Sequence, residues 1–207
     1  DTIVFDKTGT ITQGKPELVE VISFGEEKDQ ILAQVASIEA LSEHPLSQAI
    51  VDKASEKGLA LEPVENFISL TGLGLQAQVA GRMLYVGNDK LMNQQAIAID
   101  AASKTAKAMT EQGQTPIYVA DDKHLLAILA LSDQVKPDSA QAITKLKELG
   151  LQVVMLTGDN DQTARAIAKQ VGLDHVISNV LPDQKAKAIL DLKKEGHQVA
   201  MVGDGIN

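Results

Sequence analysis

The feature that most constrains the fold is an alternation of helical segments and apolar runs in the last third of the chain. The apolar runs are continuous, which is typical of strands that helices cover on both faces. Together with a first buried strand at Thr2–Phe5, they predict a parallel, doubly wound α/β sheet. The expected helices are Pro137–Leu149, Thr163–Val171 and Pro182–Glu195, and the expected strands are Gln152–Leu156, His175–Ile177 and Gln198–Val202.

The middle of the chain has a different pattern. Helical periodicity over Asp29–Leu41, Pro45–Lys57 and Asp100–Gln112 accompanies short strands that tight turns join, which predicts an antiparallel sheet with helices packed on it. We therefore expect an α+β domain at residues 15–131, inserted into an α/β domain made of residues 1–14 and 132–207. The expected strands of the inserted domain are Asn66–Leu70, Gly74–Val79, Arg82–Val86, Pro116–Ala120 and Leu125–Leu131.

Composition excludes several classes of function. The formal net charge of -9 opposes binding to nucleic-acid phosphates or to an anionic membrane surface, so we expect no nucleic-acid partner. The chain has no cysteine, which excludes disulfides and cysteine metal ligands within it. No stretch approaches the ~18 apolar residues of a membrane span, and we expect a soluble monomer.

The two ends of the chain are abrupt. The sequence starts inside an apolar run and stops after Gly203-Asp204-Gly205-Ile206-Asn207, whereas natural termini are usually polar. We expect a piece of a longer protein, with its α/β domain truncated at the C-terminus.

Polar clusters follow the predicted parallel strands. Asp6 follows the first strand, Thr157-Gly158-Asp159 and Gly203-Asp204-Gly205 follow two others, and Lys185 lies where a helix opens. Ligands of open parallel sheets bind beyond the carboxyl ends of the strands, so these clusters should converge. Carboxylates, a lysine, a hydroxyl and glycine amides suit Mg²⁺ and a phosphoryl group.

Three of these segments carry a resemblance to a family. Asp6-Lys7-Thr8-Gly9-Thr10 resembles the phosphorylation motif of P-type ATPases. Met155-Leu156-Thr157-Gly158-Asp159-Asn160 and Met201-Val202-Gly203-Asp204-Gly205-Ile206-Asn207 resemble two further signatures of that family, in the family's order. The resemblance covers essentially the whole chain and implies the haloacid-dehalogenase-like fold, with a phosphorylation domain and an inserted nucleotide-binding domain.

The resemblance also implies roles for individual residues. Asp6 is the expected nucleophile for the γ-phosphate of ATP, and Asp6, Asp204 and the Thr8 carbonyl are the expected Mg²⁺ ligands. Lys185 would neutralise phosphoryl charge, while Thr157, the Gly158 amide and Asn207 would hold phosphoryl oxygens. Lys7 and Asp159 would orient the nucleotide or each other. Asp133 with Lys136 resembles another family pattern, or is a helix cap and a surface lysine.

Position 8 distinguishes this chain from many phosphatases of the same fold. Those enzymes carry a second aspartate two residues after the nucleophile, whereas this chain has Thr8. Without a carboxyl group there to activate water, an acyl phosphate on Asp6 should persist. In the family a separate actuator domain supplies the hydrolysing group, so the actuator and transmembrane domains of a parent pump are expected partners.

Two motifs of the inserted domain narrow the resemblance. Ser42-Glu43-His44-Pro45-Leu46 and Gly72-Leu73-Gly74 resemble motifs of the heavy-metal-transporting subclass, and the context favours copper(I) over zinc, cadmium or lead. The resemblance implies that an adenine pocket is lined by Glu39, His44, Gly72, Gly74 and Asn88. Taken alone, His44-Pro45 would be interpreted as a helix-breaking turn.

The leading hypothesis is the cytoplasmic ATP-binding and phosphorylation unit of an integral membrane pump. Two alternatives stay open. One is a free-standing dehalogenase-like phosphatase, which Thr8 and the insert argue against. The other is a nucleotide-binding module that performs no chemistry in isolation.

Overall fold

The computed structural model describes residues 1–205 and divides them into two compact units. Unit 1 contains residues 1–15, 110–113 and 133–205, and unit 2 contains residues 16–109 and 114–132. Lys15, expected in the inserted domain, lies in unit 1, and Ser132, expected in the α/β domain, ends a strand of unit 2.

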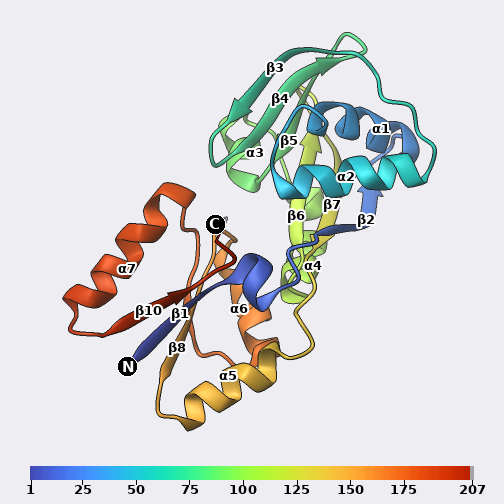
Figure 1. Cartoon of the computed structure of the whole chain (residues 1–207). Coiled ribbons are helices and arrows are strands. Elements are labelled where there is room, and N and C mark those ends of the chain that lie inside the picture. Colours follow the sequence, from blue (N-terminus) through green and yellow to red (C-terminus); the bar gives the residue numbers. More distant parts are fainter. Residues whose placement is uncertain (206–207) are drawn as a thin grey trace. The chain divides into compact units, whose positions relative to one another are not determined.

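Unit 1 is built on a four-stranded parallel sheet with the order β10-β1-β8-β9. In Figure 1, β10, β1 and β8 lie side by side, with α7 to one side and α5 and α6 to the other. The strands are β1 (Thr2–Asp6), β8 (Gln152–Leu156), β9 (His175–Ile177) and β10 (Val199–Val202). The helical segments are the single turn η1 (Lys7–Ile11), α5 (Ser139–Glu148), α6 (Asp161–Val171), η3 (Pro182–Gln184) and α7 (Lys185–Lys194).

The two faces of this sheet carry separate apolar clusters. Val153 and Met155 of β8 pack with residues of α5 and α6, such as Ile143 and Ile167. Val154 alternates to the other face, where the cluster includes residues of α7. The central strands β1 and β8 are covered on both faces and are continuous apolar runs, whereas the edge strand β10 is largely exposed. The predicted parallel α/β sheet is confirmed.

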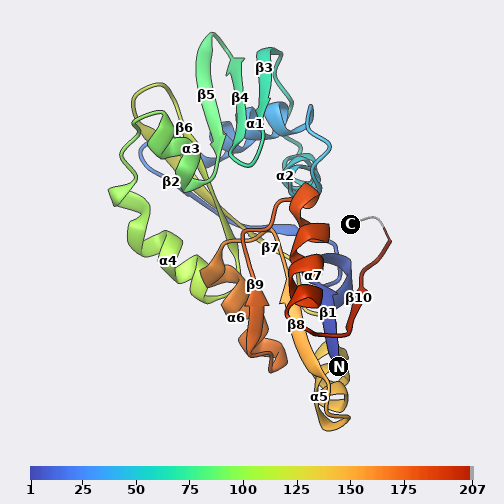
Figure 2. The same cartoon turned by 90° about the vertical axis from the view of Figure 1, so that its left-hand side faces the viewer.

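Unit 2 is built on a six-stranded antiparallel sheet with the order β2-β7-β6-β5-β4-β3. Figure 2 shows α1 and α2 on one face of this sheet and α3 and α4 on the other. The strands are β2 (Glu17–Ser23), β3 (Val64–Leu70), β4 (Gly74–Val79), β5 (Arg82–Gly87), β6 (Thr115–Ala120) and β7 (Leu125–Ser132). The helices are α1 (Lys28–Glu39), α2 (Pro45–Glu56), α3 (Asp89–Gln94), η2 (Asp100–Ala102) and α4 (Ser103–Glu111).

Several element boundaries differ from the expectation for local physical reasons. The helix expected to start at Thr163 starts at Asp161, because the Asn160 side chain accepts a hydrogen bond of 2.9 Å from the Thr163 amide and caps it. The helix expected over residues 100–112 is divided into the 3₁₀ turn η2 and α4. The strand β2 and the short helix α3 were not among the expected elements.

No helix within residues 1–205 combines the length and the apolar character that crossing a bilayer requires.

Candidate functional site

Asp6 lies at the carboxyl end of β1 and is almost completely buried, with 1% of its surface exposed. Its Oδ2 atom accepts a hydrogen bond of 2.7 Å from Nζ of Lys185, the first residue of α7. A buried carboxylate is costly without a counter-charge, and Lys185 supplies one. The Asp6 carboxylate and its counter-charge Lys185 therefore lie at the edge of the sheet where ligands of such sheets bind.

Asp204 lies beside the turn η1, which follows Asp6 and contains Gly9. A Cβ atom built on Gly9 would lie 2.6 Å from Oδ2 of Asp204, and one built on Gly203 would lie 3.9 Å from Cβ of Asp6. Gly9 also has φ of +77°, which favours glycine. The absence of a side chain at Gly9 thus lets the Asp204 carboxylate approach the turn that follows Asp6.

The three polar clusters converge because β10, β1 and β8 are adjacent and parallel. Thr157 follows β8 and is buried, and its Oγ1 accepts a hydrogen bond of 3.1 Å from the Asp159 amide. Since that oxygen accepts from the backbone, the hydroxyl hydrogen can be donated to a ligand. Gly158, between them, is exposed.

Lys7 and Asp159 form a second ion pair in unit 1. Lys7 Nζ lies 2.6 Å from Asp159 Oδ2, and the two side chains are 9% and 18% exposed. Asp159 Oδ2 accepts no hydrogen bond within residues 1–205, so its contact with Lys7 is electrostatic. The two side chains therefore orient each other.

The turn after Asp6 is anchored by residues near the return into unit 1. Thr12 is fully buried, and its hydroxyl donates to Asp133 Oδ2 at 2.5 Å and accepts from the Gly9 amide at 3.4 Å. Asp133 Oδ1 accepts from the Lys15 amide at 3.2 Å, and Lys136 Nζ donates to the Gly9 carbonyl at 2.8 Å.

The helix-cap interpretation of Asp133 is therefore wrong, because Asp138 occupies the N-cap position of α5. Sequence reasoning did not identify Thr12 as part of this anchor. Its place in the run Thr8-Gly9-Thr10-Ile11-Thr12, beside the nucleophile motif, was the available signal.

In unit 2, the connection between α1 and α2 holds two of the residues expected in the adenine pocket. Glu39 ends α1 and is buried, and its Oε2 accepts a hydrogen bond from the hydroxyl of Ser47 in the first turn of α2. Burial raises the pKa of the Glu39 carboxyl, and the Ser47 hydrogen bond opposes that shift.

His44 is the N-cap residue of α2. Its Nδ1 accepts a hydrogen bond of 3.1 Å from the Leu46 amide, and Pro45 occupies the start of the helix. An acceptor role for Nδ1 requires the tautomer with hydrogen on Nε2. His44 and Pro45 thus form the turn that precedes α2, and the same turn fixes the orientation of the His44 imidazole.

The other expected pocket residues lie around the start of β4 and the end of β5. Asn88 donates from Nδ2 to the Gly72 carbonyl at 2.8 Å and caps α3 by accepting from the Leu91 amide at 3.0 Å. A Cβ on Gly74 would lie 2.2 Å from the Val86 carbonyl oxygen. Packing of β4 on β5 therefore already requires glycine at position 74.

A family model for haloacid dehalogenase-like hydrolases matches residues 1–207. The chain belongs to the haloacid dehalogenase-like hydrolases. Among solved structures, this hydrolase chain is similar to the catalytic domain of the CPx-ATPase CopB-B, with a TM-score of 0.75 and 30% identity. The match covers 99% of this chain and 71% of that one.

The hydrolase chain is also similar to two curated proteins named as copper-transporting and copper-exporting ATPases. It is 45% identical over 208 residues to copper-transporting ATPase 2 of Rhizobium meliloti (strain 1021). It is 48% identical over 207 residues to a copper-exporting P-type ATPase of Staphylococcus haemolyticus (strain JCSC1435). These alignments cover the whole chain but only 25% and 26% of the relatives, so the chain spans about a quarter of their length. The family resemblance and fold class inferred from sequence are confirmed.

The residues of unit 1 fit the Mg²⁺ that the family uses. Mg²⁺ prefers oxygen ligands and usually takes one or two protein carboxylates. The Asp204 carboxylate approaches the turn at Gly9, which follows Asp6 in the chain, and Gly203 lies next to the Asp6 side chain. Asn207, expected to hold a phosphoryl oxygen, lies outside the described residues.

Proposed function

We propose that this chain is the ATP-binding and phosphorylation unit of a P-type heavy-metal pump, and that Asp6 takes the γ-phosphate of ATP. The observation that carries the proposal is the buried Asp6 carboxylate, 2.7 Å from Lys185 at the carboxyl end of β1. Unit 1 is then the phosphorylation domain, and unit 2 the nucleotide-binding domain.

The proposed chemistry is a displacement at phosphorus. An oxygen of Asp6 attacks the γ-phosphorus while the bond to the β,γ-bridging oxygen breaks, and ADP leaves with that electron pair. Lys185 shields the charge of the nucleophile from that of the incoming phosphoryl group. The Thr157 hydroxyl and the Gly158 amide donate to the phosphoryl oxygens.

Asp6, Asp204 and the Thr8 carbonyl are the proposed Mg²⁺ ligands, and Asn207 is a proposed phosphoryl ligand. Mg²⁺, when bound, supplies charge neutralisation for the transferring group. The Lys7–Asp159 pair fixes the Asp159 side chain close in sequence to Thr157 and Gly158.

The persistence of the acyl phosphate is assigned to Thr8. A threonine side chain cannot remove a proton from water as an aspartate would, so the product on Asp6 outlives its formation. A pump requires such an intermediate, because the stored phosphate has to drive a change of conformation before it is hydrolysed.

In unit 2, we assign adenine binding to Glu39, His44, Gly72, Gly74 and Asn88. Glu39 would accept from the exocyclic amine, and the capped imidazole of His44 would pack on or orient the purine. The Gly72 loop, which Asn88 holds, lets the backbone approach the nucleotide.

The transported ion and the remaining partners follow from the relatives. The two curated relatives are named as copper-transporting and copper-exporting ATPases, which supports Cu⁺ as the cargo. We propose that the chain works on the cytoplasmic side of the membrane, together with actuator and transmembrane domains of the same pump, and that the piece itself is monomeric.

The test is labelling with γ-³²P-ATP and Mg²⁺, followed by an acid quench and hydroxylamine treatment, with Asp6→Asn as the control. We expect label that hydroxylamine releases and that Asp6→Asn lacks. ATP binding without any label would instead favour a nucleotide-binding module that is inactive in isolation. Rapid turnover of simple phosphate esters would favour a free-standing phosphatase.

A further inference from the structure

Glu39 is a buried carboxylate that has no charged partner among residues 1–205. Only 7% of its surface is exposed, and Ser47 is the only hydrogen-bond partner of its carboxylate within residues 1–205. Ser47 satisfies Oε2, so Oε1 has no partner there. Oε1 is not among the buried oxygens of the described residues that lack a partner, so it is accessible, and a ligand can donate a hydrogen bond to it.

The Glu39 carboxylate lies between the end of α1 and the start of α2, and this position affects the stability of its ionised form. Glu39 ends α1, where the helix dipole is unfavourable for an anion. Ser47 lies in the first turn of α2, where the dipole favours one, and it is 3% exposed. The hydroxyl of Ser47 therefore holds the carboxylate toward the helix end that stabilises its charge.

Two influences act on the pKa of Glu39. Burial raises the pKa, and the hydrogen bond from Ser47 lowers it. Among the described residues, no charged side chain from α2, β2, β3 or β4, the elements packed on α1, is a cause of the shift. The titratable groups of the connecting loop, Glu43 and His44, are exposed. Ser47 is thus the one local group that favours the ionised form of Glu39.

The protonation state of Glu39 decides which purine it recognises. An ionised carboxylate only accepts hydrogen bonds, so it suits the 6-amino group of adenine and repels the 6-oxo group of hypoxanthine. A protonated carboxyl can donate to the 6-oxo group, and the discrimination is lost. This step rests on the proposed role of unit 2 in binding ATP.

We propose that Ser47 is a positioning residue that fixes the Glu39 carboxylate as an acceptor and so determines the preference of unit 2 for 6-amino over 6-oxo purine nucleotides. Ser47 acts through Glu39 and needs no contact with the nucleotide.

The test compares ATP with inosine triphosphate, which has a 6-oxo group in place of the 6-amino group and carries a hydrogen on N1. We would titrate the chain and its Ser47→Ala variant with each nucleotide by calorimetry between pH 5 and pH 8. The unaltered chain should prefer ATP, and Ser47→Ala should reduce the ratio of the two affinities about tenfold, as the loss of a hydrogen bond to a charged group predicts. In Ser47→Ala the acidic loss of ATP binding should also begin at higher pH, because an influence that lowers the Glu39 pKa is gone.

The matched control is Ser37→Ala. Ser37 is also buried in unit 2, and its hydroxyl donates to the Ala33 carbonyl and accepts from the Glu62 amide, without contacting Glu39. This variant should lose stability but keep the nucleotide ratio and the pH profile. Ser47→Thr, which keeps the hydroxyl donor, should retain both.

The outcomes are separable. An unchanged ratio and pH profile in Ser47→Ala, with ATP still bound, would overturn the role of Ser47 and leave the proposed function intact. A chain that binds no ATP at all would overturn both. If Ser47→Ala does not fold, Glu39→Gln decides: its amide both donates and accepts, so it should bind the two nucleotides almost equally, and a retained preference for ATP would overturn the inference.

Discussion

Two lysines of unit 1 each lie within hydrogen-bonding distance of one carboxylate. Lys185 Nζ lies 2.7 Å from Asp6 Oδ2, and Lys7 Nζ lies 2.6 Å from Asp159 Oδ2. The two pairs have separate roles in the proposed function. Lys185 acts on the transferring phosphate, and Lys7 fixes the position of Asp159.

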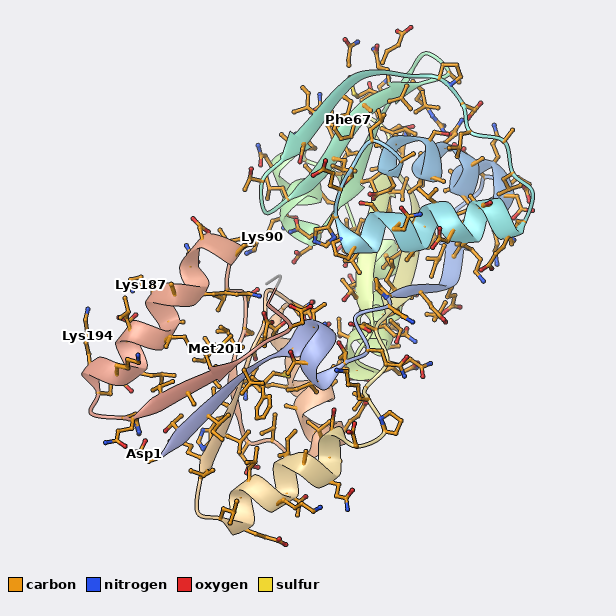
Figure 3. The ribbon with its side chains drawn as sticks, in the orientation of Figure 1. Asp1, Phe67, Lys90, Lys187, Lys194 and Met201 are labelled. Carbon is orange, nitrogen blue, oxygen red and sulfur yellow. The ribbon has the colours of Figure 1, made fainter. Side chains whose placement is uncertain are left out.

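Replacement of Lys185 by methionine should remove the positive charge that Lys185 supplies to the transferring phosphoryl group. We expect the rate of phosphoenzyme formation to fall by ~10²–10³-fold, as for the loss of one group that stabilises developing charge. Rapid acid quench of the γ-³²P-ATP reaction would measure it. Lys187→Met is the matched control, because Lys187 is on the same helix, is 76% exposed and pairs with Asp191 (Figure 3). Equal rates in both variants would remove Lys185 from the chemistry.

Thr8→Asp should shorten the life of the phosphoenzyme. A carboxylate two residues after the nucleophile could act as a general base toward water, an effect of ~10²-fold or more. The measurement is the decay of the label after a chase with unlabelled ATP and a chelator. Thr8→Asn, which has similar size and no charge, should decay as the unaltered chain does, and the same decay in Thr8→Asp would contradict the role given to Thr8.

At the scale of elements, the glycines of unit 2 separate packing from binding. Gly74 begins β4 with φ of +145°, and its missing side chain is replaced in space by the Val86 carbonyl of β5. Gly81, in the turn between β4 and β5, has φ of +74° and no atom near its absent Cβ. One glycine is needed for strand contact, and the other for turn conformation only.

This difference predicts unequal costs. Gly74→Ala should destabilise the protein by about 2–4 kcal/mol, because the β4–β5 pair has to move apart. Gly81→Ala should cost about 1–2 kcal/mol from backbone strain alone. Chemical denaturation of both variants would measure the free energies of unfolding. Equal costs would show that the close contact at Val86 does not hold in solution.

Asp133 begins the returning segment of unit 1 and contacts Thr12 and Lys15, which lie at the end of the first segment of that unit. Asp133→Asn replaces one acceptor oxygen by a donor, so either the Lys15 amide loses its acceptor or the Thr12 hydroxyl has to donate to the Lys7 carbonyl alone. We expect a loss of about 1–3 kcal/mol in the free energy of unfolding, together with slower phosphorylation and unchanged ATP affinity. Asp138→Asn is the control, since that exposed side chain makes no capping hydrogen bond. A normal rate of phosphorylation in Asp133→Asn would mean that the anchor does not support the loop.

An element could be predicted from the sequence when a single physical cause sets its pattern of apolar residues. Burial on both faces makes β1 and β8 continuous apolar runs, so these strands were identifiable. In β2 the register with β7 shifts between Leu18 and Glu20, which breaks the alternation that would have identified the strand. The helix α3 has six residues, too few for periodicity to show.

At the scale of the whole molecule, the polar contacts were less predictable than the motifs. The ordered motifs placed Asp6, Lys185 and Asp204 in one group, because parallel strands present their carboxyl ends together. The contacts of Lys7 with Asp159 and of Ser47 with Glu39 depend on side-chain rotamers and on helix packing, which no spacing rule specifies. The resemblance indicated the residues of the site, whereas the structure was needed to show which of them contact each other.

Site mapping of the phosphoenzyme shows whether the phosphate goes to Asp6. Reduction of the phosphoenzyme with borohydride converts an aspartyl phosphate into homoserine, which mass spectrometry of tryptic peptides can locate. We predict homoserine at position 6, in the peptide Asp1–Lys7, only after incubation with ATP and Mg²⁺. Homoserine at another aspartate, such as Asp159 or Asp204, would contradict the account.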